Sequence, residues 1–191
     1  SALETALARG DTGYVADGEY AGNVTFNTAR SGTTTISIFK ATVASHGTDT
    51  GWSDTYGDSQ ASITNDISFT TGYWIFDGRA GTFSPTANAV TTTYGFKVAE
   101  LGANGGAAVD VVDFPSGANE ITFKYVEVSG VTNLGDWTYT SAITGVHFGK
   151  VTNITVANIY CHGADSLLYA GNGVTSDGYD STGLIVESST F

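Results

Sequence analysis

Short apolar strand patterns recur along this chain about every 30 residues, and this recurrence constrains the fold more than any other feature. One apolar position can be followed from each pattern to the next, through Ile36, Ile67, Phe96, Ile121, Ile154 and Leu184. The intervals are 31, 29, 25, 33 and 30 residues. A coil of three short strands and three bends needs a repeat of this length, so we expect consecutive coils to stack with strands about 4.8 Å apart.

Other β-rich arrangements fit this spacing poorly. A sandwich of hairpins would place a strand about every 8–12 residues, with reversals of direction. Parallel strands joined by helices would need a helical pattern between them, but after Gly10 the apolar pattern keeps a period of two. Thr, Ser and Gly are abundant while only 14% of the residues are charged, which is typical of a β surface. The sequence therefore predicts an all-β parallel β-helix of about six to seven coils, in one domain over residues 1–191.

The two ends and two long loops interrupt this pattern. Leu3, Ala6 and Leu7 fall on one face of residues 2–8, which predicts a short N-terminal capping helix within residues 1–10. Residues 41–60 and 78–94 are predicted to be insertions that leave the coils. The last strand pattern stops at Phe191 with no visible cap, so we expect further chain or another molecule to cover that end.

Three segments share one sequence pattern, which begins with an Asn or Ser followed by an alternating apolar strand. In the two longer segments a bend, a second strand and a Gly follow. The three segments are Asn119–Gly130, Asn153–Gly163 and Ser181–Phe191. With the opening segment Gly10–Tyr20, they resemble the coils of the pectate-lyase-like superfamily of right-handed parallel β-helices. The resemblance covers nearly the whole chain and implies the fold. It does not select an activity, because this fold hosts lyases, hydrolases, phage spikes, adhesins and structural proteins.

The charge balance excludes two classes of partner. Seven basic residues stand against 19 acidic ones, for a net charge of −12. Such a chain cannot neutralise a phosphate backbone, so we expect no nucleic-acid partner. An anionic membrane surface is excluded for the same reason, and the absence of a long apolar run predicts no membrane insertion.

Several features favour a secreted, extracellular or cell-surface setting. The chain has few Lys, no Met, and two sequons that begin at Asn23 and Asn153, which are predicted glycosylation sites if the source modifies such sequences. The single cysteine, Cys161, lies in an apolar strand pattern. It permits no internal disulfide and is expected to be a small buried side chain.

The loop at residues 46–60 carries the clearest binding pattern. Trp52 and Tyr56 stand among Asp49, Asp54 and Asp58. Aromatic faces and carboxylate edges suit a sugar ring, so these five residues are candidates for carbohydrate binding. The same Asp residues could hold Ca²⁺, although their spacing matches no known calcium loop. A third interpretation is an Asp-capped turn whose aromatic rings fold over the side of the β-helix.

Candidate catalytic residues are few. Asp177 and Asp180 in Asp177-Gly178-Tyr179-Asp180 resemble the first acidic motif of polygalacturonase-type hydrolases, but the other motifs of that family are missing and turn formation is the alternative. Arg79, after Asp77 and Gly78, could serve as the base of a lyase-type reaction or form an ordinary turn salt bridge. The three histidines match no metal spacing, so the sequence predicts no metal site and no cofactor other than a possible Ca²⁺.

These observations favour an extracellular structural or adhesive β-helix protein, with end-to-end self-association into a fibre or filament as one form of it. The alternative is a polysaccharide-active enzyme, a lyase or glycoside hydrolase, or a carbohydrate-binding module whose partner is a glycan. The sequence leaves enzymatic activity undecided and favours its absence.

Overall fold

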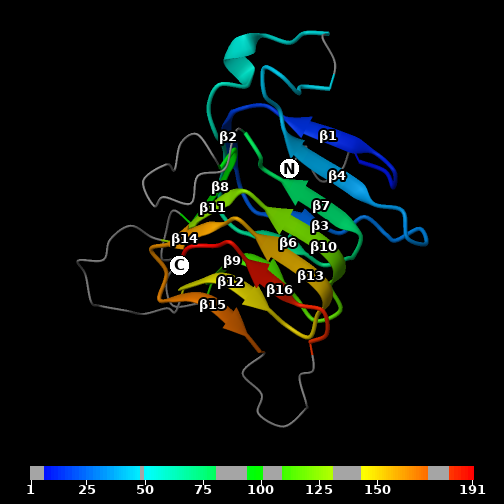
Figure 1. The fold of residues 1–191 in the computed structure, drawn as a ribbon, viewed down its shortest axis with the longest axis vertical. Helices are drawn as coiled ribbons and strands as arrows, with labels where there is room; N and C mark the ends of the chain where they lie inside the picture. The colour runs from blue at the N-terminus through cyan, green and yellow to red at the C-terminus, as the bar shows by residue number, and fades with distance from the viewer. Residues whose placement is uncertain (1–6, 48–49, 81–93, 101–108, 131–142, 172–180) are drawn as a thin grey trace.

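The computed structural model is built almost entirely of short strands that wind into stacked coils (Figure 1). It describes residues 7–47, 50–80, 94–100, 109–130, 143–171 and 181–191. The one helix among these residues is a single 3₁₀ turn, η1 (Asp54–Tyr56). Every third strand returns to the same sheet, so the described strands form three parallel sheets.

The strands divide among three sheets, which we name A, B and C. Sheet A contains β1 (Thr12–Val15), β4 (Ile36–Lys40), β7 (Trp74–Asp77), β10 (Asn119–Lys124), β13 (Thr152–Ala157) and β16 (Ile185–Glu187). Sheet B contains β2 (Gly18–Ala21), β5 (Ala61–Thr64), β8 (Phe96–Ala99), β11 (Val126–Ser129) and β14 (Tyr160–His162). Sheet C contains β3 (Val24–Phe26), β6 (Ile67–Phe69), β9 (Val109–Phe114), β12 (Ile143–Phe148) and β15 (Ser166–Ala170). The predicted parallel β-helix is therefore confirmed.

Residues that face the interior stack in columns from coil to coil. In sheet A, one column runs through Ile36, Trp74, Ile121 and Ile154, each aligned with the next by the strand register. All four side chains are buried. Because a buried apolar side chain repeats at each level, the coils share one continuous apolar core rather than several small ones.

This column corrects the series of apolar positions, spaced about 30 residues apart, from which the fold was predicted. Ile36, Ile121 and Ile154 do lie on one sheet, but Ile67 belongs to β6 in sheet C and Phe96 to β8 in sheet B. The true partner of Ile36 in the third coil is Trp74. Insertions lengthened the early coils, so an even spacing of about 30 residues followed strands from different sheets.

Sheet C contributes a column of stacked phenylalanines to the core. The rings of Phe26, Phe69, Phe114 and Phe148 follow one another at centroid distances of 4.6, 5.3 and 5.2 Å. All four are fully buried. Offset stacking of this kind adds about 0.5–1.5 kcal/mol per pair beyond the burial of apolar area.

The bend between sheets A and B is very short in the later coils. One left-handed residue follows each strand of sheet A, with φ of 56° at Tyr125, 52° at Asn158 and 49° at Ser188. In the second and third coils the predicted insertions 41–60 and 78–94 fall between the strands of sheets A and B, and residues 48–49 and 81–93 of them are outside the described part of the chain.

The predicted capping helix lies mostly on residues 1–6, outside the described part of the chain. Leu7 and Ala8 are not helical, and Arg9 and Gly10 form a turn, so no capping helix is seen. Instead Arg9 secures this end, because its guanidinium donates to the carbonyls of Gly72 and Tyr73, both at 2.9 Å. Across the described residues, no helix is long and apolar enough to cross a membrane.

Candidate functional site

A column of polar side chains runs along the outer face of sheet C. Strand register aligns its members from coil to coil, and these are Thr25, Ser68, Asp113, His147 and Tyr169. Each lies next to a core residue on its own strand, because alternate strand residues face opposite sides. The β-helix thus brings together polar groups that are 22 to 45 residues apart in sequence.

His147 is the centre of this column. Its Nδ1 donates to Asp113 Oδ1 at 2.8 Å and lies 3.3 Å from Asp110 Oδ2, while its Nε2 donates to the carbonyl of Gly171 at 2.7 Å. The ring also stacks on Tyr169, with centroids 5.7 Å apart. Ser68 Oγ donates to Asp113 at 3.1 Å and not to the histidine, so the trio does not form an activated serine nucleophile.

Hydrogen bonds shift the pKa of His147 upward. Burial alone would lower the pKa of the imidazole. Hydrogen bonds to Asp113 and to the Gly171 carbonyl, together with the charges of Asp110 and Asp113, outweigh burial and raise this pKa. These partners therefore favour the protonated, positively charged form of the ring more than burial alone would.

A shallow hollow of about 250 Å³ opens beside these groups. Its lining includes Asp66, Asp110 and Asp113. Burial, a hydrogen bond with Glu100 and the nearby acidic charges raise the pKa of Asp66 to about 7. Burial likewise raises the pKa of Asp110, against the opposing effect of His147. Asp66 and Asp110 therefore favour the protonated form more than an exposed Asp does.

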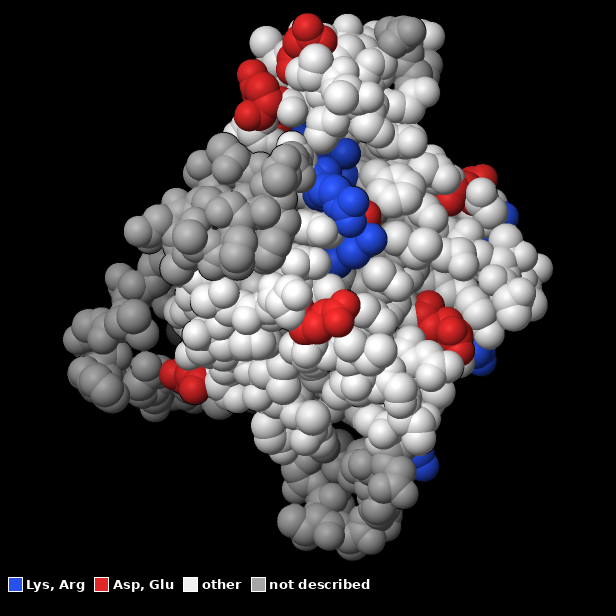
Figure 2. All heavy atoms as spheres, viewed as in Figure 1, with Lys and Arg blue, Asp and Glu red and all other residues white. Residues whose placement is uncertain are grey.

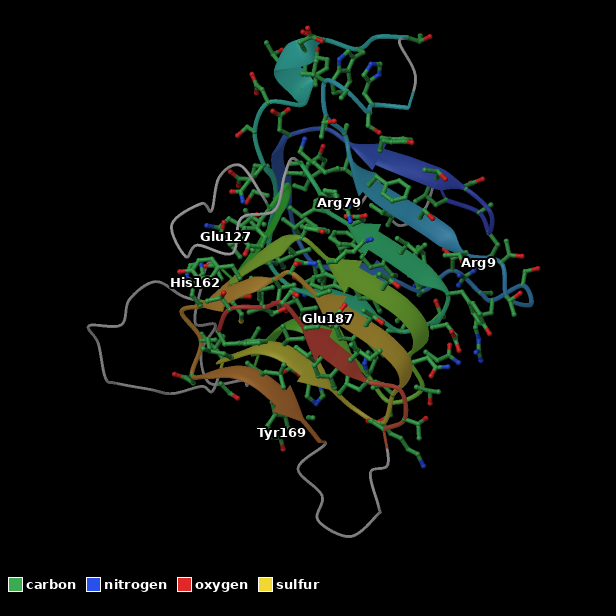
Figure 3. All side chains as sticks on the ribbon, viewed as in Figure 1. Arg9, Arg79, Glu127, His162, Tyr169 and Glu187 are labelled. Carbon is green, nitrogen blue, oxygen red and sulfur yellow. The ribbon has the colours of Figure 1, made fainter. Side chains whose placement is uncertain are left out.

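A second polar cluster lies on the outer face of sheet B and is centred on Glu127. Its carboxylate accepts hydrogen bonds from Lys97 Nζ at 2.8 Å, His162 Nε2 at 3.1 Å and Gln60 Nε2 at 3.1 Å. These partners come from the second, third and fifth coils, and Glu127 from the fourth. Figure 3 shows Glu127 and His162 side by side on this part of the molecule.

The side chain of Glu127 is buried, with only 4% of it exposed. The cost of burying its charge is offset by its hydrogen bonds. Burial alone would raise its pKa, yet hydrogen bonds from Lys97, Gln60 and His162 lower it overall. The hydrogen bonds from these three donors to the Glu127 carboxylate connect four coils. The arrangement suits a structural role better than proton transfer, which requires a pKa near the working pH.

The loop at 46–60 forms a small aromatic cluster outside the coils. The Trp52 ring stacks on His46 at 4.4 Å and meets Tyr56 edge-on at 6.1 Å. Trp52 Nε1 donates to Asp54 Oδ1 at 3.2 Å, so its polar edge is satisfied within the loop. Tyr56 remains 47% exposed. The structure thus combines the folded-over turn with one aromatic side chain that faces solvent.

Contacts with the first coil hold this loop in place. The backbone N–H of Asp17 donates to the carbonyl of Tyr56, and that of Ser59 donates to Asp17 Oδ2, both at 2.9 Å. A hollow of about 380 Å³ lies beside the loop, and its lining includes Asp58. Asp49 lies outside the described residues. No group of three metal ligands involves Asp54 or Asp58 in the part of the chain that is described, so Ca²⁺ in this loop stays a prediction.

The candidate catalytic residues do not meet in these sites. Arg79 is exposed on the face shown in Figure 3, where its guanidinium lies 4.6 Å from the centre of the Tyr125 ring. The neighbouring Asp77 forms its ion pair with Lys124, at 3.1 Å, rather than with Arg79. Asp177 and Asp180 lie outside the described residues, so their roles stay predictions.

Both sequons are accessible. Asn23 is exposed and accepts a hydrogen bond from Asn65 at 3.0 Å. Asn153 is exposed and donates to Glu120 at 2.6 Å. Glycosylation at either site stays a prediction of the sequence.

Sequence reasoning missed Asp110, Asp113 and His147 as a group. The available signal was the charge itself: two Asp inside the apolar strand β9 and a His between Val146 and Phe148 in β12. These charges could not show that β9 and β12 lie side by side, because strand pairing cannot be read from the length of the segment between two strands. Comparisons with protein-family models, curated proteins and solved structures show no match to this chain.

Proposed function

We propose that this chain is an extracellular structural or adhesive β-helix protein whose aromatic loop at residues 46–60 contacts a glycan. The exposed Tyr56 side chain, fixed edge-on to Trp52, carries the proposal. Tyr offers an apolar face and a polar tip at low entropic cost, which suits a sugar ring.

Preorganisation and surface chemistry support this assignment. The loop is held to the first coil through Asp17, so little ordering would accompany binding. Figure 2 shows that most of the described surface on this face carries neither acidic nor basic side chains. Since the loop itself is acidic at Asp54 and Asp58 and the chain has a net charge of −12, we assign a neutral rather than an anionic glycan.

A glycan array followed by titration of the best ligand tests the adhesive proposal. Tyr56→Ala should weaken binding by roughly 2- to 10-fold, the value of one aromatic contact of about 0.5–1.5 kcal/mol. Tyr169→Ala is the matched control, because Tyr169 is similarly exposed, at 41%, but lies on sheet C. No binding to any array member, or equal losses in both variants, would refute the glycan contact.

The fibre form of the proposal concerns the last coil. Val186 aligns with the buried Val156 and so faces the core side, yet it is 37% exposed. A strand of a second copy could continue the parallel ladder here. Light scattering across a concentration series should show self-association that Val186→Lys abolishes, and a monomer at every concentration would refute this form.

A polysaccharide-active enzyme is the second candidate, and the hollow on sheet C favours it. A carboxyl group with a pKa of about 7, Asp66, lies there beside the ionisable groups Asp110 and Asp113. A glycoside hydrolase needs such a protonated acid near a carboxylate. A reducing-end assay on neutral and acidic polysaccharides should detect cleavage that Asp113→Asn abolishes, and no cleavage by the unmodified chain would eliminate this candidate.

A further inference from the structure

Three potential metal ligands converge between neighbouring strands of sheet C. One carboxylate oxygen each of Asp110 and Asp113 and a ring nitrogen of His147 all lie within 4.8 Å of one another. Asp110 and Asp113 belong to β9, and His147 belongs to β12, its register partner. Atoms this close can contact one ion with small side-chain movements, and two rigid parallel strands hold them there.

The histidine is oriented as a ligand from outside the group. Its Nε2 donates to the Gly171 carbonyl at 2.7 Å, which leaves Nδ1 directed at the two carboxylates. Histidines that bind metals commonly donate their other ring N–H to a backbone carbonyl or carboxylate in this way, which fixes the ring and its tautomer.

An independent observation points to a missing partner in the adjoining hollow. Asp66 Oδ1 is buried and has no hydrogen-bond partner among the described residues, although the Asp66 side chain also forms a hydrogen bond with Glu100. A buried carboxylate oxygen without a partner is costly unless a cation or donor reaches it. Asp66 lines the same hollow as Asp110 and Asp113, together with further oxygen-bearing side chains, those of Asn23, Thr25 and Ser68.

We propose that Asp110, Asp113 and His147 bind one divalent first-row transition-metal ion, with Asp66 beside the site in the same hollow. An imidazole among carboxylates favours Zn²⁺ or a related ion over Ca²⁺, which takes oxygen ligands. The ion would displace the proton from Nδ1 and link β9 to β12. This inference rests on neither the glycan contact nor the enzymatic candidate.

Zinc binding to the EDTA-stripped chain at fixed neutral pH tests the proposal. Titration calorimetry and elemental analysis after desalting should give one Zn²⁺ per chain. His147→Gln and Asp113→Asn should each weaken binding at least tenfold. His46→Gln and Asp58→Asn remove a histidine and an acid from the loop at 46–60, and both should retain the affinity of the unmodified chain.

Co²⁺ supplies a readout that surface adsorption would not reproduce. Its visible absorption should show a bound spectrum that changes in His147→Gln, because the nitrogen ligand is lost. Circular dichroism checks each variant, and if His147→Gln does not fold, Asp113→Asn decides the matter through its loss of affinity. Sub-stoichiometric zinc, or equal affinity in site and control variants, means an adventitious ion only and overturns the proposal.

Discussion

Replacing Phe114 by Ala should destabilise the chain more than almost any other single change, because this ring lies in the middle of the core. Phe114 is 0% exposed and stacks between Phe69 and Phe148 at 5.3 and 5.2 Å. It also meets Phe123 of sheet A edge-on at 5.8 Å. The substitution therefore removes contacts with two neighbouring coils and with a second sheet.

The expected loss is about 3–5 kcal/mol of unfolding free energy, the range for Phe to Ala in a core. The upper part of this range applies, because backbone ladders on both sides hold β6 and β12 apart and prevent the space from closing. Phe114→Leu keeps most of the volume and should cost about 1–1.5 kcal/mol. Phe191→Ala is the matched control, since Phe191 is 46% exposed and should change stability by less than about 1 kcal/mol.

Urea unfolding measures these differences when circular dichroism and tryptophan fluorescence give coincident transitions. A loss below about 1 kcal/mol for Phe114→Ala, or a loss equal to that of Phe191→Ala, would refute the reasoning. It would mean that the phenylalanines do not stack from coil to coil, so the strand register of sheet C would be wrong.

Three further predictions test other parts of the structure. Glu127→Gln should cost about 1–3 kcal/mol in urea unfolding, less than a fully buried pair because Lys97 is 31% exposed. Since the pKa of Glu127 is lowered on folding, its contribution to the free energy of unfolding is complete at pH values above its pKa in the unfolded chain. This contribution is lost as the pH falls through its pKa in the folded chain. If Glu127→Gln leaves the dependence of stability on pH in acid unchanged, this reasoning is contradicted. Cys161 is 0% exposed and burial raises its pKa to about 12, so iodoacetamide should leave it unmodified by mass spectrometry until the chain is unfolded, and rapid labelling of the native protein would disprove its burial. Gly78→Ala should destabilise by about 1–3 kcal/mol or more in thermal unfolding, because the new methyl group would collide with the backbone of Tyr125, whereas an unchanged Tm would show that the coils can separate there.

The sequence alone determined the local structure and the fold class. Strand cores such as Ile121-Thr122-Phe123 alternate with a period of two, and no helical pattern separates them. Local alternation is readable because each strand residue faces either the core or the solvent. The recurrence of about 30 residues then indicated stacked parallel coils, and the predicted insertion at 41–60 does lie between β4 and β5, while most of the second, 78–94, is outside the described residues.

Only the tertiary structure decided which strands lie side by side. Ile67 and Phe96 fit the spacing yet belong to sheets C and B, and Trp74 takes the place assumed for Ile67. A loop at a bend changes the number of residues between two paired strands without changing their backbone hydrogen bonds. Sequence spacing therefore does not predict strand pairing where a loop has been inserted. For the same reason the contact between Asp113 and His147, which are 34 residues apart, could not be predicted, because it depends on register and not on any local pattern.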